Sequence, residues 1–168
     1  MPKAKIATKT KVSKILKTSE TKPLYSIQIL ETVFDPWQCL IEYQQNSMQG
    51  RCDYGATATF VGTMRDFNLG DSVTAMVLEH YPAMTKKQLE AIMTTCFSRW
   101  DIHNALLIHR VGHIRPAEPI VLVAVWSAHR AAAFDACRQL MEDLKHYAPF
   151  WKKEQLSQGG ERWVETNT

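Results

Sequence analysis

Two lysines that lie close together in the sequence, Lys145 and Lys152, are the side chains with the clearest chemical potential. Apolar residues recur every three or four positions before Lys145, which predicts an amphipathic helix with this lysine in its last turn. Pro149 lacks a backbone N–H and disfavours helical geometry at Ala148, so the helix is expected to end near His146 and Lys152 to lie in the following loop. The two amines are therefore expected to converge.

A lysine at the C-terminal end of a helix also has a purely structural explanation, because a cation there faces the negative end of the helix dipole. In the catalytic alternative, apolar surroundings and a second cation lower the pKa of an ammonium group, so that part of it is free amine near neutral pH. Such an amine can act as an acid, a base or a nucleophile. The spacing alone leaves both interpretations open, and the neighbouring Lys153 is expected to be solvated.

The other end of the same predicted helix carries the residue types of an anion site. Residues 120–126 form an apolar, β-branched run that is typical of a strand buried on both faces. Ser127 follows as a candidate N-cap, and His129 and Arg130 then stand beside the free N–H groups of the first helical turn. A phosphate group fits such a corner. A partly buried histidine and a solvated arginine explain the same two residues without a ligand.

Alternating strand and helix patterns must position these two sites. The predicted elements are strands at residues 24–30, 56–61, 73–80, 105–111 and 120–126, and helices at 36–45, after a capping box at Thr85 to Gln88, and up to His146. Arg65 follows the second strand in a loop with turn chemistry, so the strands on either side of it resemble a hairpin. The order predicts a single-domain α+β fold, an α/β sandwich in which a mixed or antiparallel sheet packs with about three helices.

The charge distribution divides the chain of 168 residues into a tail and one domain. Residues 1–22 hold seven lysines and one glutamate, so that of the 20 basic and 17 acidic residues, 13 and 16 remain in residues 23–168. We interpret residues 1–22 as a disordered lysine-bearing tail and 23–168 as the folded domain. A slightly acidic domain argues against nucleic-acid binding, which needs a basic face that spans many phosphates.

Neither a membrane segment nor a targeting signal is evident in the sequence, and the cysteines favour a cytoplasmic protein. Cys39, Cys52, Cys96 and Cys137 form no CxxC pair, and the last two fall on apolar helix faces, so reduced and buried thiols are expected there. His109 and His113 have a spacing that suggests metal ligands. They lie where a strand enters a turn, without a supporting Cys, Asp or Glu cluster, so we favour a structural role and predict no metal.

Several short motifs occur in one order between about Tyr54 and Glu165. They are Phe60–Arg65 with Asn68–Asp71, Leu78–Pro82, Ile108–Gly112, Ser127–Arg130, Lys145–Glu154 and Arg162–Glu165. Together they resemble the family of large, catalytic subunits of molybdopterin synthase. Enzymes of that family place the dithiolene sulfurs on the pterin precursor of molybdenum cofactor.

The resemblance implies an activity and a set of site residues. The substrate would be a cyclic pyranopterin monophosphate, and sulfur would arrive as a C-terminal thiocarboxylate on a small ubiquitin-like partner that ends in Gly-Gly. The matching residues are Lys145 and Lys152 as catalytic lysines, Arg65, His129 and Arg130 as substrate-binding residues, and Phe60 and Met141 as possible pocket-lining positions. A strand phenylalanine and a helix-face methionine are also explained by core packing alone.

The resemblance further implies a homodimer of this chain within a heterotetramer, with one carrier at each end. The C-terminus lacks Gly-Gly and no cysteine lies in a sulfur-carrier motif, so the carrier is expected to be a separate chain. No cofactor is expected, because the sulfur comes from the partner. The alternative hypothesis is a non-catalytic module that binds a phosphate ligand or a partner, which would hold its ligand without converting it.

Overall fold

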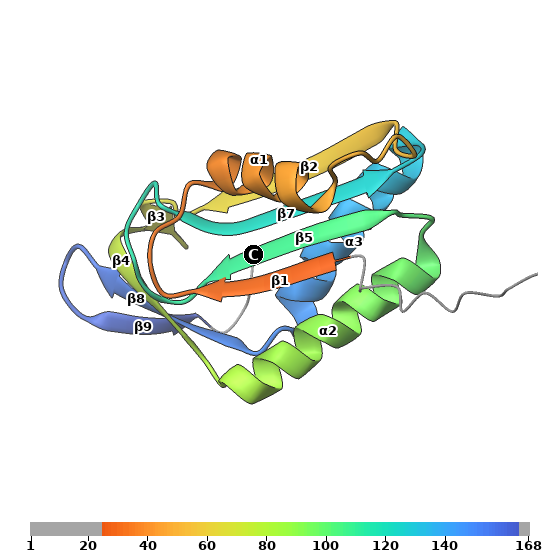
Figure 1. Cartoon of the computed structure of the whole chain (residues 1–168). Helices are drawn as coiled ribbons and strands as arrows, with labels where there is room; N and C mark the ends of the chain where they lie inside the picture. The colour runs from red at the N-terminus through yellow and green to blue at the C-terminus, as the bar shows by residue number, and fades with distance from the viewer. Residues whose placement is uncertain (1–24, 165–168) are drawn as a thin grey trace, which may run out of the picture.

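A computed structural model of the protein describes residues 25–164 (Figure 1). The elements in chain order are β1 Tyr25–Leu30, α1 Pro36–Ser47, β2 Ala56–Thr63, β3 Phe67–Asn68, β4 Asp71–His80, α2 Pro82–Arg99, β5 Asn104–Arg110, β6 Gly112–Ile114, β7 Pro119–Ser127, α3 Arg130–Tyr147, β8 Phe150–Leu156 and β9 Glu161–Val164. The predicted tail at residues 1–22 lies outside the described residues. The predicted α+β class with three helices is confirmed for residues 25–164.

The first sheet has the strand order β1-β5-β7-β2 and is mixed, because β1 runs parallel to β5 and the other pairs are antiparallel. Figure 1 shows α1 on one side of this sheet and α2 and α3 on the other. Apolar side chains of α2 and α3 pack on one face of the central strands, and Leu40 and Tyr43 of α1 pack on the opposite face. Burial on both faces explains why residues 120–126 form an unbroken apolar run.

The second sheet has the order β3-β4-β8-β9, and β6 also pairs with β4. It lies at one end of the first sheet (Figure 1) and has its own apolar cluster, which includes Met76, Leu78 and Ile114. The chain passes from α3 directly into β8, and Pro149 lies between the two elements. The C-terminal end of α3 is therefore next to the start of β8 in the second sheet. None of the helices within residues 25–164 is long and apolar enough to cross a membrane.

The predicted hairpin of residues 56–61 and 73–80 is wrong. Strand β2 pairs with β7, whereas β4 pairs with β3, β6 and β8. The turn residues between them close a tighter hairpin of β3 with β4, in which Leu69 and Gly70 take positive φ angles of 51° and 86°. The turn is short, because Asn68 pairs directly with Asp71. Since β3 and not β2 is the partner of β4 at this turn, β2 pairs with β7 in the first sheet.

The predicted start of α1 is confirmed, and the predicted start of α2 is wrong. At α1 the Asp35 carboxylate accepts hydrogen bonds from the N–H groups of Trp37 at 2.9 Å and Gln38 at 3.1 Å, and Pro36 follows at the first helical position. Helix α2 begins at Pro82, so Thr85 is buried inside it instead of capping it. Proline at the first helical position was the stronger signal.

Candidate active site

A cavity of about 370 Å³ lies where the C-terminal end of α3 meets the first sheet and the second sheet. Five of the seven predicted site residues line it, namely Phe60, Arg65, Met141, Lys145 and Lys152. They come from β2, the loop after it, α3 and β8. The convergence of the two lysines, predicted from the chain break at Pro149, is confirmed by their shared cavity.

The two lysines reach the cavity from different kinds of structure. Lys145 is exposed in the last turn of α3, as predicted. Lys152 is half-buried on β8 opposite Leu78 of β4, so its prediction as a loop residue is wrong. Residues alternate between the two faces of a strand, so Lys152 and Glu154 line the cavity and Lys153 lies on the other face. Pairing with β4 gives Lys152 a defined backbone position that a loop would not provide.

The ammonium group of Lys152 has a perturbed acidity. Burial lowers its pKa, and the nearby charge of Lys145 lowers it further, while the carboxylate of Glu154 opposes both effects. This is the pKa shift that the residue types predicted for a lysine beside apolar walls and a second cation. A lysine of this kind exchanges a proton more readily near neutral pH than a solvated lysine. The catalytic role of either lysine stays a prediction.

Glu154 is a cavity residue that was not predicted from the sequence. Its buried carboxylate accepts hydrogen bonds from Asn68 Nδ2 at 2.7 Å and from the guanidinium of Arg162 at 2.8 Å. Arg162 also donates to the Asp71 carboxylate at 2.7 Å. Asn68 and Asp71 belong to one of the short motifs of the sequence analysis, and Arg162 belongs to another. Their presence in these motifs is the sequence signal that could have indicated a role at the site. These hydrogen bonds hold the Glu154 carboxylate in the wall of a cavity whose other charged lining residues are Arg65, Lys145 and Lys152.

His109 is a second cavity residue whose position the sequence did not reveal. Its buried ring stacks on Phe150, with 4.0 Å between ring centres and 11° between planes, and Nδ1 lies 2.8 Å from the carbonyl oxygen of Arg110. Burial lowers the pKa of His109 to about 4, with further lowering by Lys152, so the ring is neutral and Nδ1 is the donor. His113 is exposed, and residues 25–164 contain no cluster of three or more potential metal-binding side chains.

Phe60 and Met141, the two apolar residues predicted to line the pocket or to pack in the core, both line the cavity. Phe60 is 42% exposed, which is too open for a core residue, and Met141 is half-buried against the main core. Next to Phe60, a Cβ at Gly62 would lie 2.8 Å from a methyl carbon of Val121, so any other residue there would displace the Val121 side chain. The backbone of β2 therefore lies close to β7 in this wall. Pocket lining describes both residues better than core packing alone.

Arg65 is exposed at the cavity, and its guanidinium carbon lies 5.0 Å from the ring centre of Phe67. The other predicted anion-binding residues are elsewhere. His129 and Arg130 are exposed at the N-terminal end of α3 and do not line the cavity. Fifteen residues separate Arg130 from Lys145, which is about 22 Å along a helix. One chain therefore does not bring all the predicted substrate-binding residues together.

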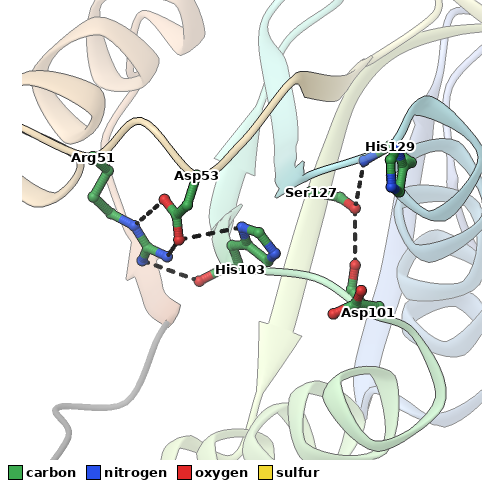
Figure 2. A network of polar contacts seen from close by, with 6 residues as sticks. All are labelled: Arg51, Asp53, Asp101, His103, Ser127 and His129. Carbon is green, nitrogen blue, oxygen red and sulfur yellow. Dashed lines mark hydrogen bonds and ion pairs between the residues drawn. The ribbon is translucent and has the colours of Figure 1, made fainter.

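The predicted role of Ser127 as the N-cap of this helix is wrong. The N-cap is His129, whose extended backbone precedes Arg130 and whose side chain makes no capping hydrogen bond. Ser127 is still in β7. Its hydroxyl accepts a hydrogen bond from the His129 N–H at 3.3 Å and donates to the Asp101 carbonyl oxygen at 2.8 Å (Figure 2). It therefore connects the end of β7 to the loop after α2.

A cavity with two lysines, an arginine, a neutral histidine and a carboxylate is typical of an enzyme site that handles an anionic substrate. The model of the MoaE protein family matches residues 34–147, and the chain belongs to this family. A molybdopterin synthase catalytic subunit of Ralstonia nicotianae is 56% identical over 116 residues, which cover 69% of this chain and 65% of that protein. One from Pseudomonas aeruginosa is 46% identical over 140 residues, which cover 83% and 90% of the two chains.

The fold is shared with solved structures as well. The crystal structure of molybdopterin synthase from Staphylococcus aureus matches with a TM-score of 0.71 and 27% identity, covering 82% of this chain and 95% of that one. Family membership agrees with the resemblance that the motifs indicated. The matched segment contains Lys145, but it ends before Lys152, β8 and β9.

Proposed function

We propose that this chain is the catalytic subunit of a molybdopterin synthase. It would transfer sulfur from a thiocarboxylated, ubiquitin-like small subunit to cyclic pyranopterin monophosphate and so form the dithiolene of molybdopterin. The observation that carries this proposal is the single cavity that joins Lys145, Lys152 and Arg65. The names of the relatives support it independently.

The cavity chemistry suits such a transfer. Each transfer forms a carbon–sulfur bond on the substrate in place of a carbon–oxygen bond, whose oxygen departs with the proton that it needs. The bond between sulfur and the carrier's carbonyl carbon breaks, and water supplies the oxygen that turns the carrier's C-terminus into a carboxylate. Negative charge develops at the attacked carbonyl oxygen, and Lys145 is placed to stabilise it. Lys152, whose pKa is lowered, is suited to move protons to and from the reacting groups. Two such transfers complete one dithiolene, and no cofactor takes part.

The two ends of α3 are too far apart for their basic side chains to meet in one chain. His129 and Arg130 are too far from Lys145 to act on the same substrate within one chain. If they bind the substrate phosphate, they must reach the cavity of another copy. We therefore propose that His129 and Arg130 of a second copy complete each cavity, next to Arg65 of the first copy. This requires the homodimer that the family resemblance implies.

The partner and its location follow from the same proposal. The small subunit would carry sulfur on a C-terminal Gly-Gly thiocarboxylate, and two small subunits with two copies of this chain would form a heterotetramer. An extended tail is the form that can enter a cavity of about 370 Å³. We place the complex in the cytoplasm, where the free thiols of the buried Cys96 and Cys137 would stay reduced.

The proposal is tested by reconstitution. Purified chain is mixed with thiocarboxylated small subunit and cyclic pyranopterin monophosphate, and dithiolene formation is measured for the wild type, Lys145→Ala and Lys153→Ala. Lys153 is a matched control because its ammonium pairs with Glu161 at 2.9 Å on the opposite face of β8. We expect product with the wild type and the control, and none with Lys145→Ala. Carrier binding without product in the wild type would contradict the proposal and favour a binding module.

A further inference from the structure

Three loops meet at the N-terminal end of α3, and their polar contacts centre on Ser127 (Figure 2). Ser127 is 1% exposed, and its hydroxyl uses both its donor and its acceptor capacity. It donates to Asp101 in the loop after α2 and accepts from the His129 N–H. The main chain at the same point is also held, because the His103 N–H donates to the Trp126 carbonyl oxygen at 2.7 Å. The direction of the chain after β7 is thus set by contacts outside α3.

The loop before β2 holds the corner from a second side. The Gly55 N–H donates to the Ser127 carbonyl oxygen at 3.0 Å. A Cβ at Gly55 would lie 2.8 Å from the carbonyl oxygen of Ala128, a backbone atom that cannot turn away as a side chain can. Any other residue at position 55 must push the corner outward. The close approach therefore fixes the position of Ala128, which directly precedes His129.

The loop after α2 is itself held by the same neighbouring segment. Arg51 forms a two-pronged ion pair with Asp53, at 3.0 Å and 2.6 Å, and donates to the His103 carbonyl oxygen at 3.3 Å. Figure 2 shows Arg51 and Asp53 beside His103, and Ser127 beside Asp101 of the same loop. The contacts therefore continue from Arg51 through residues 101–103 to Ser127 and His129. Arg51 adds indirect support to the corner.

The backbone of this corner and the side chains that follow it differ in their contacts. The residues beneath the corner are buried or hydrogen-bonded, while the two side chains that project from it, His129 and Arg130, are exposed. The His129 side chain does not cap the helix that it begins. A helix start that needed only stability would be served by a capping side chain at this position. Here the hydrogen-bonded backbone instead precedes two exposed side chains, those of His129 and Arg130.

We propose that Ser127 is a positioning residue, whose hydroxyl aims His129 and Arg130 at the anionic part of the substrate. The inference rests on the proposed function, and Ser127 acts through these two residues without touching the substrate. Loss of its hydroxyl would leave the lysines in place and loosen only the anion-binding pair. The expected signature is weaker substrate binding with little change in the chemical step.

The test is steady-state kinetics on the complex with thiocarboxylated small subunit at varied concentrations of cyclic pyranopterin monophosphate. We expect Ser127→Ala to raise KM by about tenfold and to change kcat by less than about twofold. Ser127→Thr keeps the hydroxyl and should restore most of the affinity. Ser98→Ala is the matched control, because it removes a serine hydroxyl that donates at 2.8 Å to the Thr95 carbonyl oxygen, within α2.

Gly55→Ala provides a second route to the same result if Ser127→Ala does not fold, because it displaces Ala128 without removing a hydrogen-bonding group. It should also raise KM more than it lowers kcat. An unchanged KM in a folded Ser127→Ala or Gly55→Ala complex overturns the inference while leaving the proposed function intact. Equal falls in kcat and in the amount of folded protein would also overturn it. Absence of turnover in the wild type would remove the proposed function and this inference with it.

Discussion

The basic side chains near the two ends of α3 lie in opposite environments. At the C-terminal end, Lys145 and Lys152 share a cavity with buried neighbours, and burial with mutual repulsion lowers the pKa of Lys152. At the N-terminal end, His129 and Arg130 are exposed above a backbone held by hydrogen bonds from two other loops. Low polarity around a charge changes its chemistry, whereas exposure leaves it suited to attracting an anion. One helix thus separates the proposed proton transfer from the proposed phosphate binding.

A loss of activity as large as that of Lys145→Ala is expected from removing the half-buried lysine, Lys152. Lys152→Ala should lower kcat by about 10²-fold or more, because positioned proton transfer contributes at least that much. The measurement is single-turnover dithiolene formation, with circular dichroism to verify folding. His129→Ala should instead raise KM with a smaller change in kcat. A Lys152→Ala enzyme that keeps its kcat would remove the proposed difference between the two ends of the helix.

A mixed-dimer experiment tests whether the two ends belong to one site in different copies. At a substrate concentration well below the KM of the variants, Lys145→Ala and Arg130→Ala chains are each expected to have little activity alone, the first through its kcat and the second through its KM. In a mixed dimer, one cavity keeps its lysine and receives Arg130 from the other copy, so activity should return to about half of the wild-type sites. The chains would be co-expressed with two different tags and the mixed species purified. If the mixed dimer recovers no activity, Arg130 of one copy does not complete the cavity of the other copy, and the proposed sharing of the site is wrong.

The smallest of these effects concerns the pH profile. The Glu154 carboxylate raises the pKa of Lys152, so Glu154→Gln should lower that pKa further, and the limb of the kcat/KM profile that reports Lys152 should move to lower pH. Glu90→Gln in α2 is the control, because Glu90 does not line the cavity. A shift to higher pH, or the same shift in both variants, would show that Glu154 does not act on Lys152.

Local sequence signals predicted the elements that local geometry decides. Asp35 followed by Pro36 predicted the start of α1, and Pro149 predicted the end of α3 within one residue. The apolar run at residues 120–126 predicted a strand buried on both faces. These signals act over a few residues, so they do not depend on the fold. The ordered motifs likewise indicate the family, because the residue types and their order are properties of the sequence alone.

Strand pairing and burial were decided only by the tertiary structure. β8 has two lysines and a glutamate in seven residues, and it becomes a strand because β4 and β9 lie on either side of it. Glu154 meets Asn68 across 86 positions of sequence, and His109 meets Phe150 across the two sheets.

The sequence by itself therefore determined which side chains are available, where α1 begins and α3 ends, and the family. Only the tertiary structure decided that Lys152 is held on a strand beside Glu154 and His109, and that His129 and Arg130 lie at the far end of α3. The physical reason is that a pKa or a shared cavity depends on neighbours brought together by packing, and these neighbours come from distant parts of the chain.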